Sequence, residues 1–198
     1  MSRKLATLIR AVSRRLLLVE RALITGFMFL LVGLVLLNVT TRYLGRSIYW
    51  VDESAVFSVV WLTFIGASAM TRLRLDFAVQ MLTEKLSEAN RRRAQIVSTV
   101  SVTLFGLLLG WMCWLWLDPA GIVTAGFDAR EFSARSFNFV YSERTQTLNW
   151  PTWIIYLIMP IFAVSITIHG LANLVEDLGI VPREKHSAFA FAKADGIN

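Results

Sequence analysis

Four long stretches without Asp, Glu, Lys or Arg constrain this chain more than any other feature. They cover residues 22–41, 54–71, 94–117 and 145–175. A helix that rises about 1.5 Å per residue needs roughly 20 apolar residues to cross about 30 Å of hydrocarbon. Because the stretches lack the strict alternation of barrel strands, we predict helices at 22–41, 54–71, 94–117 and 150–174. Pro151 suits the first turn of the fourth helix, and Pro160 should kink it.

The composition supports a membrane protein. Charged residues make up 17% of the 198 residues, whereas soluble domains have about 25%. We therefore predict an all-α fold, an integral membrane four-helix bundle with the lipid bilayer as its surroundings. The single cysteine can form neither a disulfide within the chain nor a multi-thiolate metal site. The net charge of +6 is explained by the membrane, so we predict no nucleic-acid partner.

The distribution of arginine and lysine predicts the orientation. The amino-terminal segment, the connection between the second and third spans and the carboxyl-terminal tail (176–198) together hold fifteen Lys and Arg, and the two other loops hold five. The positive-inside rule then places both termini in the cytoplasm. The first apolar stretch is too long for a signal peptide, whose core has about 7–15 residues, so it should remain as an uncleaved anchor.

Two connections between spans are long enough to have structure of their own. In residues 73–90, apolar residues that include Val79 and Leu82 recur at helical spacing, which predicts an amphipathic helix on the cytoplasmic membrane face. A short soluble helical hairpin is the alternative. The outer loop, residues 118–149, could hold a small structured cap.

The chain offers little chemistry. Its two histidines are His169, inside the fourth apolar stretch, and His186, in the polar tail. We predict that His169 is a hydrogen-bonded neutral side chain at the membrane boundary, although an ionisable group in a span is also a candidate functional residue. No nucleotide, cofactor or metal motif is present, so we predict no enzyme activity, no cofactor and no metal. Gly106 and Gly110 allow close helix packing, either within the chain or with a partner.

Two segments carry a resemblance to a known family. The first runs from Arg42-Tyr43 through Trp50-x-x-Glu53 and Trp61 to Gly66 and Arg72, and the second is the run from Leu148 to Pro160 with its tryptophans at 150 and 153. In this order and spacing they resemble the small membrane subunit, the DctQ family, of tripartite ATP-independent periplasmic (TRAP) transporters.

The resemblance implies a small permease subunit in the bacterial inner membrane. Such a subunit braces a large membrane transport subunit, which imports an organic acid delivered by a periplasmic substrate-binding protein. The alternatives are a four-helix membrane enzyme or redox subunit, and a stand-alone membrane assembly factor. The first would need facing histidines for haem, and only His169 qualifies.

The resemblance also selects residues for structural or partner contacts. They are Arg42, Tyr43, Trp50, Glu53, Trp61, Gly66 and Arg72, to which the amphipathic stripe adds Val79 and Leu82. We predict that Arg42 pairs with Glu53 across the first outer turn, the alternative being two separately solvated charges. Trp61 lies in the middle of a span, where an interfacial aromatic belt does not explain it, so we expect it to pack against a partner helix.

Overall fold

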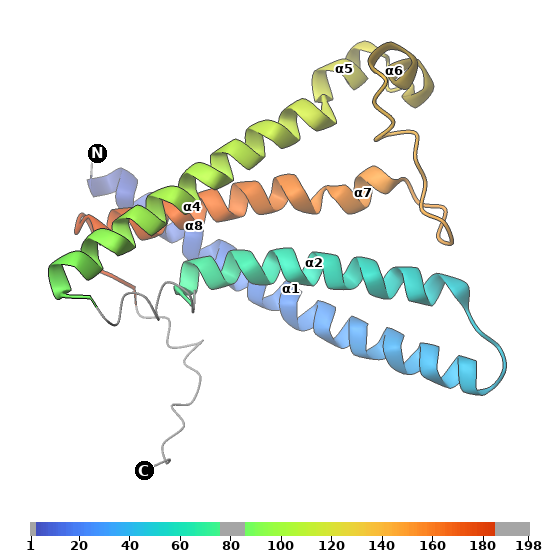
Figure 1. Cartoon of the computed structure of the whole chain (residues 1–198), viewed down its shortest axis with the longest axis horizontal. Helices are drawn as coiled ribbons and strands as arrows, with labels where there is room; N and C mark the ends of the chain where they lie inside the picture. Colours follow the sequence, from blue (N-terminus) through green and yellow to red (C-terminus); the bar gives the residue numbers. More distant parts are fainter. Residues whose placement is uncertain (1–2, 76–85, 185–198) are drawn as a thin grey trace.

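The computed structural model describes residues 3–75 and 86–184, and within these ranges the chain forms helices and no β-strand (Figure 1). Four helical segments are long and apolar enough to cross a membrane. They are α1 (Arg3–Tyr43), α2 (Tyr49–Leu73), α4 (Glu88–Leu117) and the consecutive pair α7 (Thr152–Tyr156) and α8 (Ile158–Asp177). The predicted all-α membrane bundle is confirmed.

Helix α1 starts well before the predicted start of the first span at residue 22. Its amino-terminal half is basic on the exposed side, but Ala6, Ser13, Leu17 and Glu20 are buried. These positions are three, four or seven residues apart, so they lie on one face of the helix. Packing of this face extends α1 beyond the apolar stretch.

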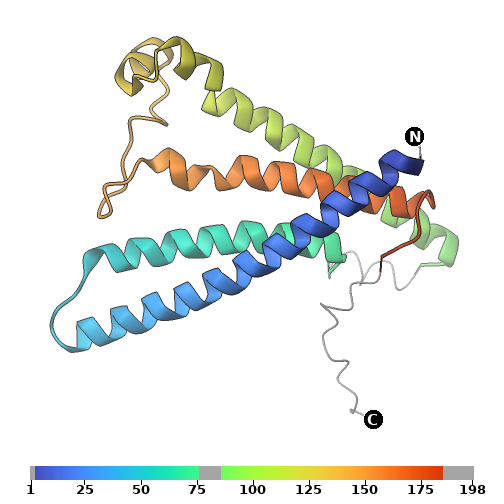
Figure 2. The same cartoon turned by 180° about the vertical axis from the view of Figure 1, so that it is seen from behind.

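Helix α8 is the central helix of the bundle. It packs against α4, α2 and α1, and α1 also packs against α2. The helices lie close together at the end that carries the amino terminus, whereas α1 and α4 are splayed apart at the opposite end (Figure 1 and Figure 2). We call these ends the inner end and the outer end, following the predicted orientation.

The contact between α4 and α8 depends on glycine. A Cβ atom added to Gly106 would lie 2.5 Å from Thr167 Oγ1, and one added to Gly170 would collide with Thr103. Gly110 faces Ala163 at an ordinary van der Waals distance. The glycine pair predicted on the third span therefore packs within the chain, because only a missing side chain lets two helix backbones approach so closely.

The fourth membrane-crossing segment is interrupted at Leu157, between α7 and α8. Pro160 follows three residues later and has no backbone N–H to donate to Tyr156 four residues before it. The structure thus shows a short break in the helix just before the proline at which a kink was predicted.

The predicted amphipathic segment, residues 73–90, is only partly described. Its first residue ends α2, and Arg74 follows in a left-handed conformation with φ of 57°. Its last residues already belong to α4, which begins at Glu88. Val79 and Leu82 lie outside the described residues, so the amphipathic helix on the membrane face stays a prediction.

The outer loop forms a cap of two short helices, α5 (Pro119–Thr124) and α6 (Ala129–Ser136). An aspartate begins each of them: Asp118 accepts a hydrogen bond from the Gly121 N–H, and Asp128 accepts from the first turn of α6. Such side-chain caps satisfy amide groups that have no partner within the helix, so the local sequence defines both helix starts.

A small apolar core holds this cap together. It consists of Ile122, Ala125, Phe132 and Val140, with Leu117, Tyr141, Trp153 and Tyr156 packed against it. The Tyr141 hydroxyl donates to the Leu117 carbonyl oxygen at 2.7 Å. Burial raises the pKa of the Tyr141 phenol, and the negative charge of Asp118 raises it further, so the hydroxyl keeps the proton that it donates.

Candidate functional site

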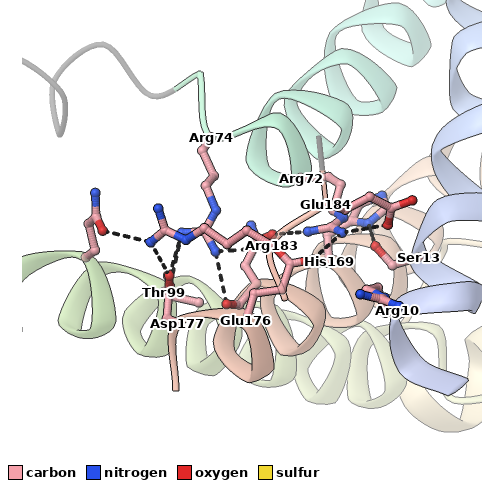
Figure 3. Close-up of polar contacts among 12 residues, drawn as sticks. Arg10, Ser13, Arg72, Arg74, Thr99, His169, Glu176, Asp177, Arg183 and Glu184 are labelled. Carbon is pink, nitrogen blue, oxygen red and sulfur yellow. Dashed lines mark hydrogen bonds and ion pairs between the residues drawn. The ribbon is translucent and has the colours of Figure 1, made fainter. Parts of the chain in front are cut away.

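Arg72, in the last turn of α2, is the largest fully buried side chain of the described chain, with 1% of its surface exposed. Its guanidinium donates to Asn173 Oδ1 at 2.5 Å and to Glu176 Oε1 at 2.7 Å, both on α8. It also lies 3.4 Å from Glu184 Oε2, in the segment that follows α8 (Figure 3). A buried charge is costly unless it is paired, and the fork of donors on one arginine reaches several acceptors at once.

Asp177 is the second centre of this inner-end network. Its buried carboxylate accepts from Arg74 at 3.0 Å, from Arg183 at 2.8 Å and from Thr99 Oγ1 at 3.0 Å. The network therefore ties together the end of α2, the amino-terminal half of α4, the end of α8 and the segment after α8 (Figure 3). Arg74 adopts a left-handed conformation, which ends α2 at this point. The side chain of the same residue contacts α8.

His169 lies deeper in the bundle and connects α8 with α1. Its Nδ1 atom is 2.7 Å from Ser13 Oγ, and its Nε2 atom is 3.0 Å from Glu20 Oε2. A neutral ring with the proton on Nε2 would donate to the carboxylate and accept from the hydroxyl, which satisfies both nitrogens. The hydrogen-bonded histidine was expected, but its acidic partner was not.

The acidic partner, Glu20, lies two residues before the first predicted span and therefore outside the charge-free stretches. A signal existed: Ser13 and Glu20 are seven residues apart, so on a helix they share a face. Ser13, Glu20 and His169 form a buried triad, in which Ser13 and His169 have no exposed surface and Glu20 has 4%. This triad can hold two helices in register.

At the outer end, the predicted pair of Arg42 and Glu53 is wrong. The Arg42 guanidinium contacts Asp52 Oδ2 at 2.6 Å and Asn38 Oδ1 at 2.9 Å. Asn38 in turn donates to Asp52, which closes a small polar cluster between α1 and α2. Adjacent residues point about 100° apart around a helix, so Asp52 faces α1 while Glu53 faces elsewhere.

Glu53 binds the end of the outer loop. Its carboxylate accepts the backbone N–H groups of Gln146 and Thr147, each at 2.8 Å, and that of Leu148 at 2.9 Å. The Thr147 hydroxyl is a fourth donor. We call this contact the outer clasp. It joins α2 to a segment more than ninety positions later in the chain, which no local sequence pattern predicts.

The remaining predicted contact residues have different surroundings. Tyr43 is almost fully exposed, and a Cβ atom on Gly66 would meet no atom within 4 Å. Trp61 stacks on Phe27 of α1, with ring centroids 6.0 Å apart. An aromatic partner for Trp61 therefore exists within the chain. Trp50 and Trp61 also line an apolar crevice of about 320 Å³ between the α1–α2 hairpin and the segment that leads into α7.

This arrangement is structural in character. The described ranges contain no group of three or more His, Cys, Asp or Glu side chains that could hold a metal ion. Their buried polar clusters connect helices at the inner end, and the clasp connects the cap to α2 at the outer end. The site thus consists of two sets of contacts that fix helices relative to one another.

Comparison with protein families agrees with this picture. The family described as "Tripartite ATP-independent periplasmic transporters, DctQ component" matches residues 31–179. The chain belongs to the DctQ family. A comparison with curated proteins and one with solved structures gave no match.

Membership of the DctQ family makes the chain a multi-pass membrane component of TRAP transporters and not an enzyme, as the resemblance implied. The matched residues include both arginines at the helix ends, Arg42 and Arg72, together with Glu53. Ser13 and Glu20 precede the matched residues. The attachment of the amino-terminal half of α1 to His169 thus adds to what the DctQ match covers.

Proposed function

We propose that this DctQ protein is the small permease subunit that braces a large transport subunit in the bacterial inner membrane, with both termini in the cytoplasm. The large subunit would import an organic acid delivered by a periplasmic binding protein. The observation that carries the bracing role is that polar contacts fix the helices at both ends. Between these ends, Gly66 faces open space, and a separate apolar crevice lies beside Trp61.

The inner-end network supports a rigid part rather than a moving one. Arg72, Glu176 and Asp177 are almost completely buried and hydrogen-bonded to one another or to their neighbours. Breaking a buried charge pair by removing one partner costs about 3–5 kcal/mol. A helix that had to slide or rotate during each transport cycle would break such contacts repeatedly, whereas a fixed brace keeps them.

The open space around Gly66 supports a contact with another helix. Small residues allow close approach of helices in a membrane, where apolar side chains gain nothing from leaving lipid. Gly106 and Gly170 use this property inside the bundle, but Gly66 does not. We therefore place the large subunit against the α2 face that carries Gly66.

Copurification tests the bracing role. The full chain is produced together with the large membrane subunit of the same transporter, and the yield of complex is measured after affinity purification of either partner. We expect Gly66→Leu to reduce the yield of complex while the free variant folds normally. Gly33→Leu is the matched control, since a Cβ atom on Gly33 also meets nothing within 4 Å.

Reconstitution tests the division of labour. We expect no organic-acid uptake by the pure chain in vesicles, and uptake when the large subunit and the binding protein are present. Uptake by the pure chain would contradict the proposal. So would a complex that forms equally well with wild type and with Gly66→Leu, because the contact would then lie elsewhere.

A further inference from the structure

A cleft at the inner end of the bundle is explained neither by packing nor by the proposed bracing role. It has a volume of about 690 Å³ and lies between the first turns of α4 and the segment that follows α8. Arg91, Arg92, Gln95 and Arg183 supply basic and amide groups to its lining. We propose that this inner cleft binds the phosphate of an anionic membrane lipid.

The position of the cleft matches the level of lipid headgroups. Arg91 and Arg92 lie three and two residues before Ala94, where the third charge-free stretch begins. On the other wall, Glu176 and Asp177 directly follow the fourth stretch, which ends at Val175. Both walls therefore leave the hydrocarbon at the same level, which is where lipid phosphates lie.

The charges around the cleft favour an anion. Its lining contains two buried carboxylates, Glu176 and Asp177, but these are already paired with Arg72, Arg74 and Arg183. Their negative charge is thus largely compensated within the inner-end network. The net charge of the cleft therefore depends on the exposed side chains at its mouth.

Two arginines and one carboxylate determine the net charge at the mouth of the cleft. Arg91 and Arg92 are exposed, as is Glu88 one turn earlier on α4. Arg92 also contacts the Asp177 carbonyl oxygen at 3.3 Å, which orients it along the cleft wall. The mouth therefore carries a net positive charge, on residues whose planar donor groups suit phosphate oxygens.

A lipid fits this cleft better than a freely diffusing ion, because the cleft borders the membrane surface and basic pockets between membrane helices bind acidic lipid headgroups. The same phosphate chemistry would also accept inorganic phosphate. The inference concerns lipid binding by the chain itself, so it does not depend on the partner proposed above.

The test uses the full chain purified in detergent, where no membrane surface potential acts. Binding of short-chain phosphatidylglycerol, short-chain phosphatidylcholine and inorganic phosphate is measured by native mass spectrometry. We expect phosphatidylglycerol to bind most tightly, and Arg91→Gln to weaken its binding about tenfold, the loss expected when one hydrogen bond between charged groups is removed.

Arg93→Gln is the matched control. It removes the same charge from the same helix turn, but Arg93 is exposed and lies outside the lining of the cleft. We expect this variant to bind phosphatidylglycerol as wild type does. Thermal melting by circular dichroism checks that both variants fold, which is expected because Arg91 and Arg93 are both exposed.

Three outcomes would overturn the proposal. Equal losses in Arg91→Gln and Arg93→Gln would show general attraction to positive charge and no defined site. Equal binding of phosphatidylglycerol and phosphatidylcholine would show no preference for an anionic headgroup. Inorganic phosphate that binds as tightly as phosphatidylglycerol would assign the cleft to a soluble anion.

Discussion

Arg42 and Arg72 are both arginines in the last turn of an apolar helix, and they show how burial decides what a charge contributes. Arg42 keeps 59% of its side chain exposed beside Asp52. Arg72 keeps 1% and is surrounded by Asn173, Glu176 and Glu184. Water screens the first pair, whereas the second has exchanged water for protein acceptors.

The first prediction compares these two arginines. Arg72→Gln leaves the buried Glu176 without its closest cation, so we expect the free energy of unfolding to fall by about 3–5 kcal/mol. Arg42→Gln should change it by about 0–1 kcal/mol. Denaturation of the purified chain in detergent measures both. Equal effects of the two substitutions would contradict the assignment of the network.

The second prediction concerns the partner of Arg42. A double-mutant cycle of Arg42→Ala and Asp52→Ala should show a coupling energy of about 0.2–1 kcal/mol, because the two side chains are in contact. The same cycle with Glu53→Ala should be additive within about 0.3–0.5 kcal/mol. Thermal unfolding of the four proteins in each cycle measures the coupling energy. Coupling of Arg42 to Glu53 and not to Asp52 would support the pair that was predicted from the sequence.

The third prediction addresses the outer clasp. Glu53→Gln removes the charge that accepts three backbone N–H groups, so the segment that contains Thr147 should detach more often. We expect faster cleavage by trypsin after Arg144, which is exposed. Asp52→Asn is the control, since it removes a neighbouring charge that does not touch this segment. Unchanged cleavage of both variants would show that the clasp does not hold the loop.

At the scale of the helices, close packing of α4 on α8 gives the bundle its centre. Gly106 and Gly170 approach Thr167 and Thr103 from opposite sides of the contact. Helix α1, in contrast, attaches to α8 through a polar triad near its amino-terminal half. The bundle therefore combines one tight backbone contact with one contact made by buried side chains.

The fourth prediction tests the tight contact. In an open helix position, replacing glycine by alanine stabilises the helix by up to about 1 kcal/mol. At Gly106 the new methyl group would collide with Thr167 and Ile166, so we expect a loss of about 1–3 kcal/mol instead. Gly33→Ala, which meets nothing, serves as the control. Thermal unfolding should show opposite signs, and stabilisation by both substitutions would contradict the packing.

At the scale of the whole molecule, fixed polar contacts lie at the two ends and apolar side chains lie between them. The inner end holds the buried network together with most of the arginines near the spans. The outer end holds the capped loop and the clasp. This polarity corresponds to the two sides of a membrane, and the arginine-rich side should be the cytoplasm.

The fifth prediction is topological. A phosphatase that is active only outside the cytoplasm should be inactive when fused after Asn198. It should be active when inserted at Gly126, in the turn between α5 and α6. The fifteen Lys and Arg on one side against five on the other motivate this result. The reverse pattern of activities would overturn the proposed orientation.

Several features could be predicted from the sequence because their causes are local. Hydrocarbon thickness and the cost of charge in lipid locate four helices, and motif order leads to the DctQ family. Tertiary structure alone decided that Arg42 pairs with Asp52, that Glu53 holds the segment at 146–148, and that Glu20 meets His169. Those choices depend on how each helix is rotated and which distant segment packs against it. A shift of one residue turns a side chain by about 100°, and spacing along the chain leaves that rotation open.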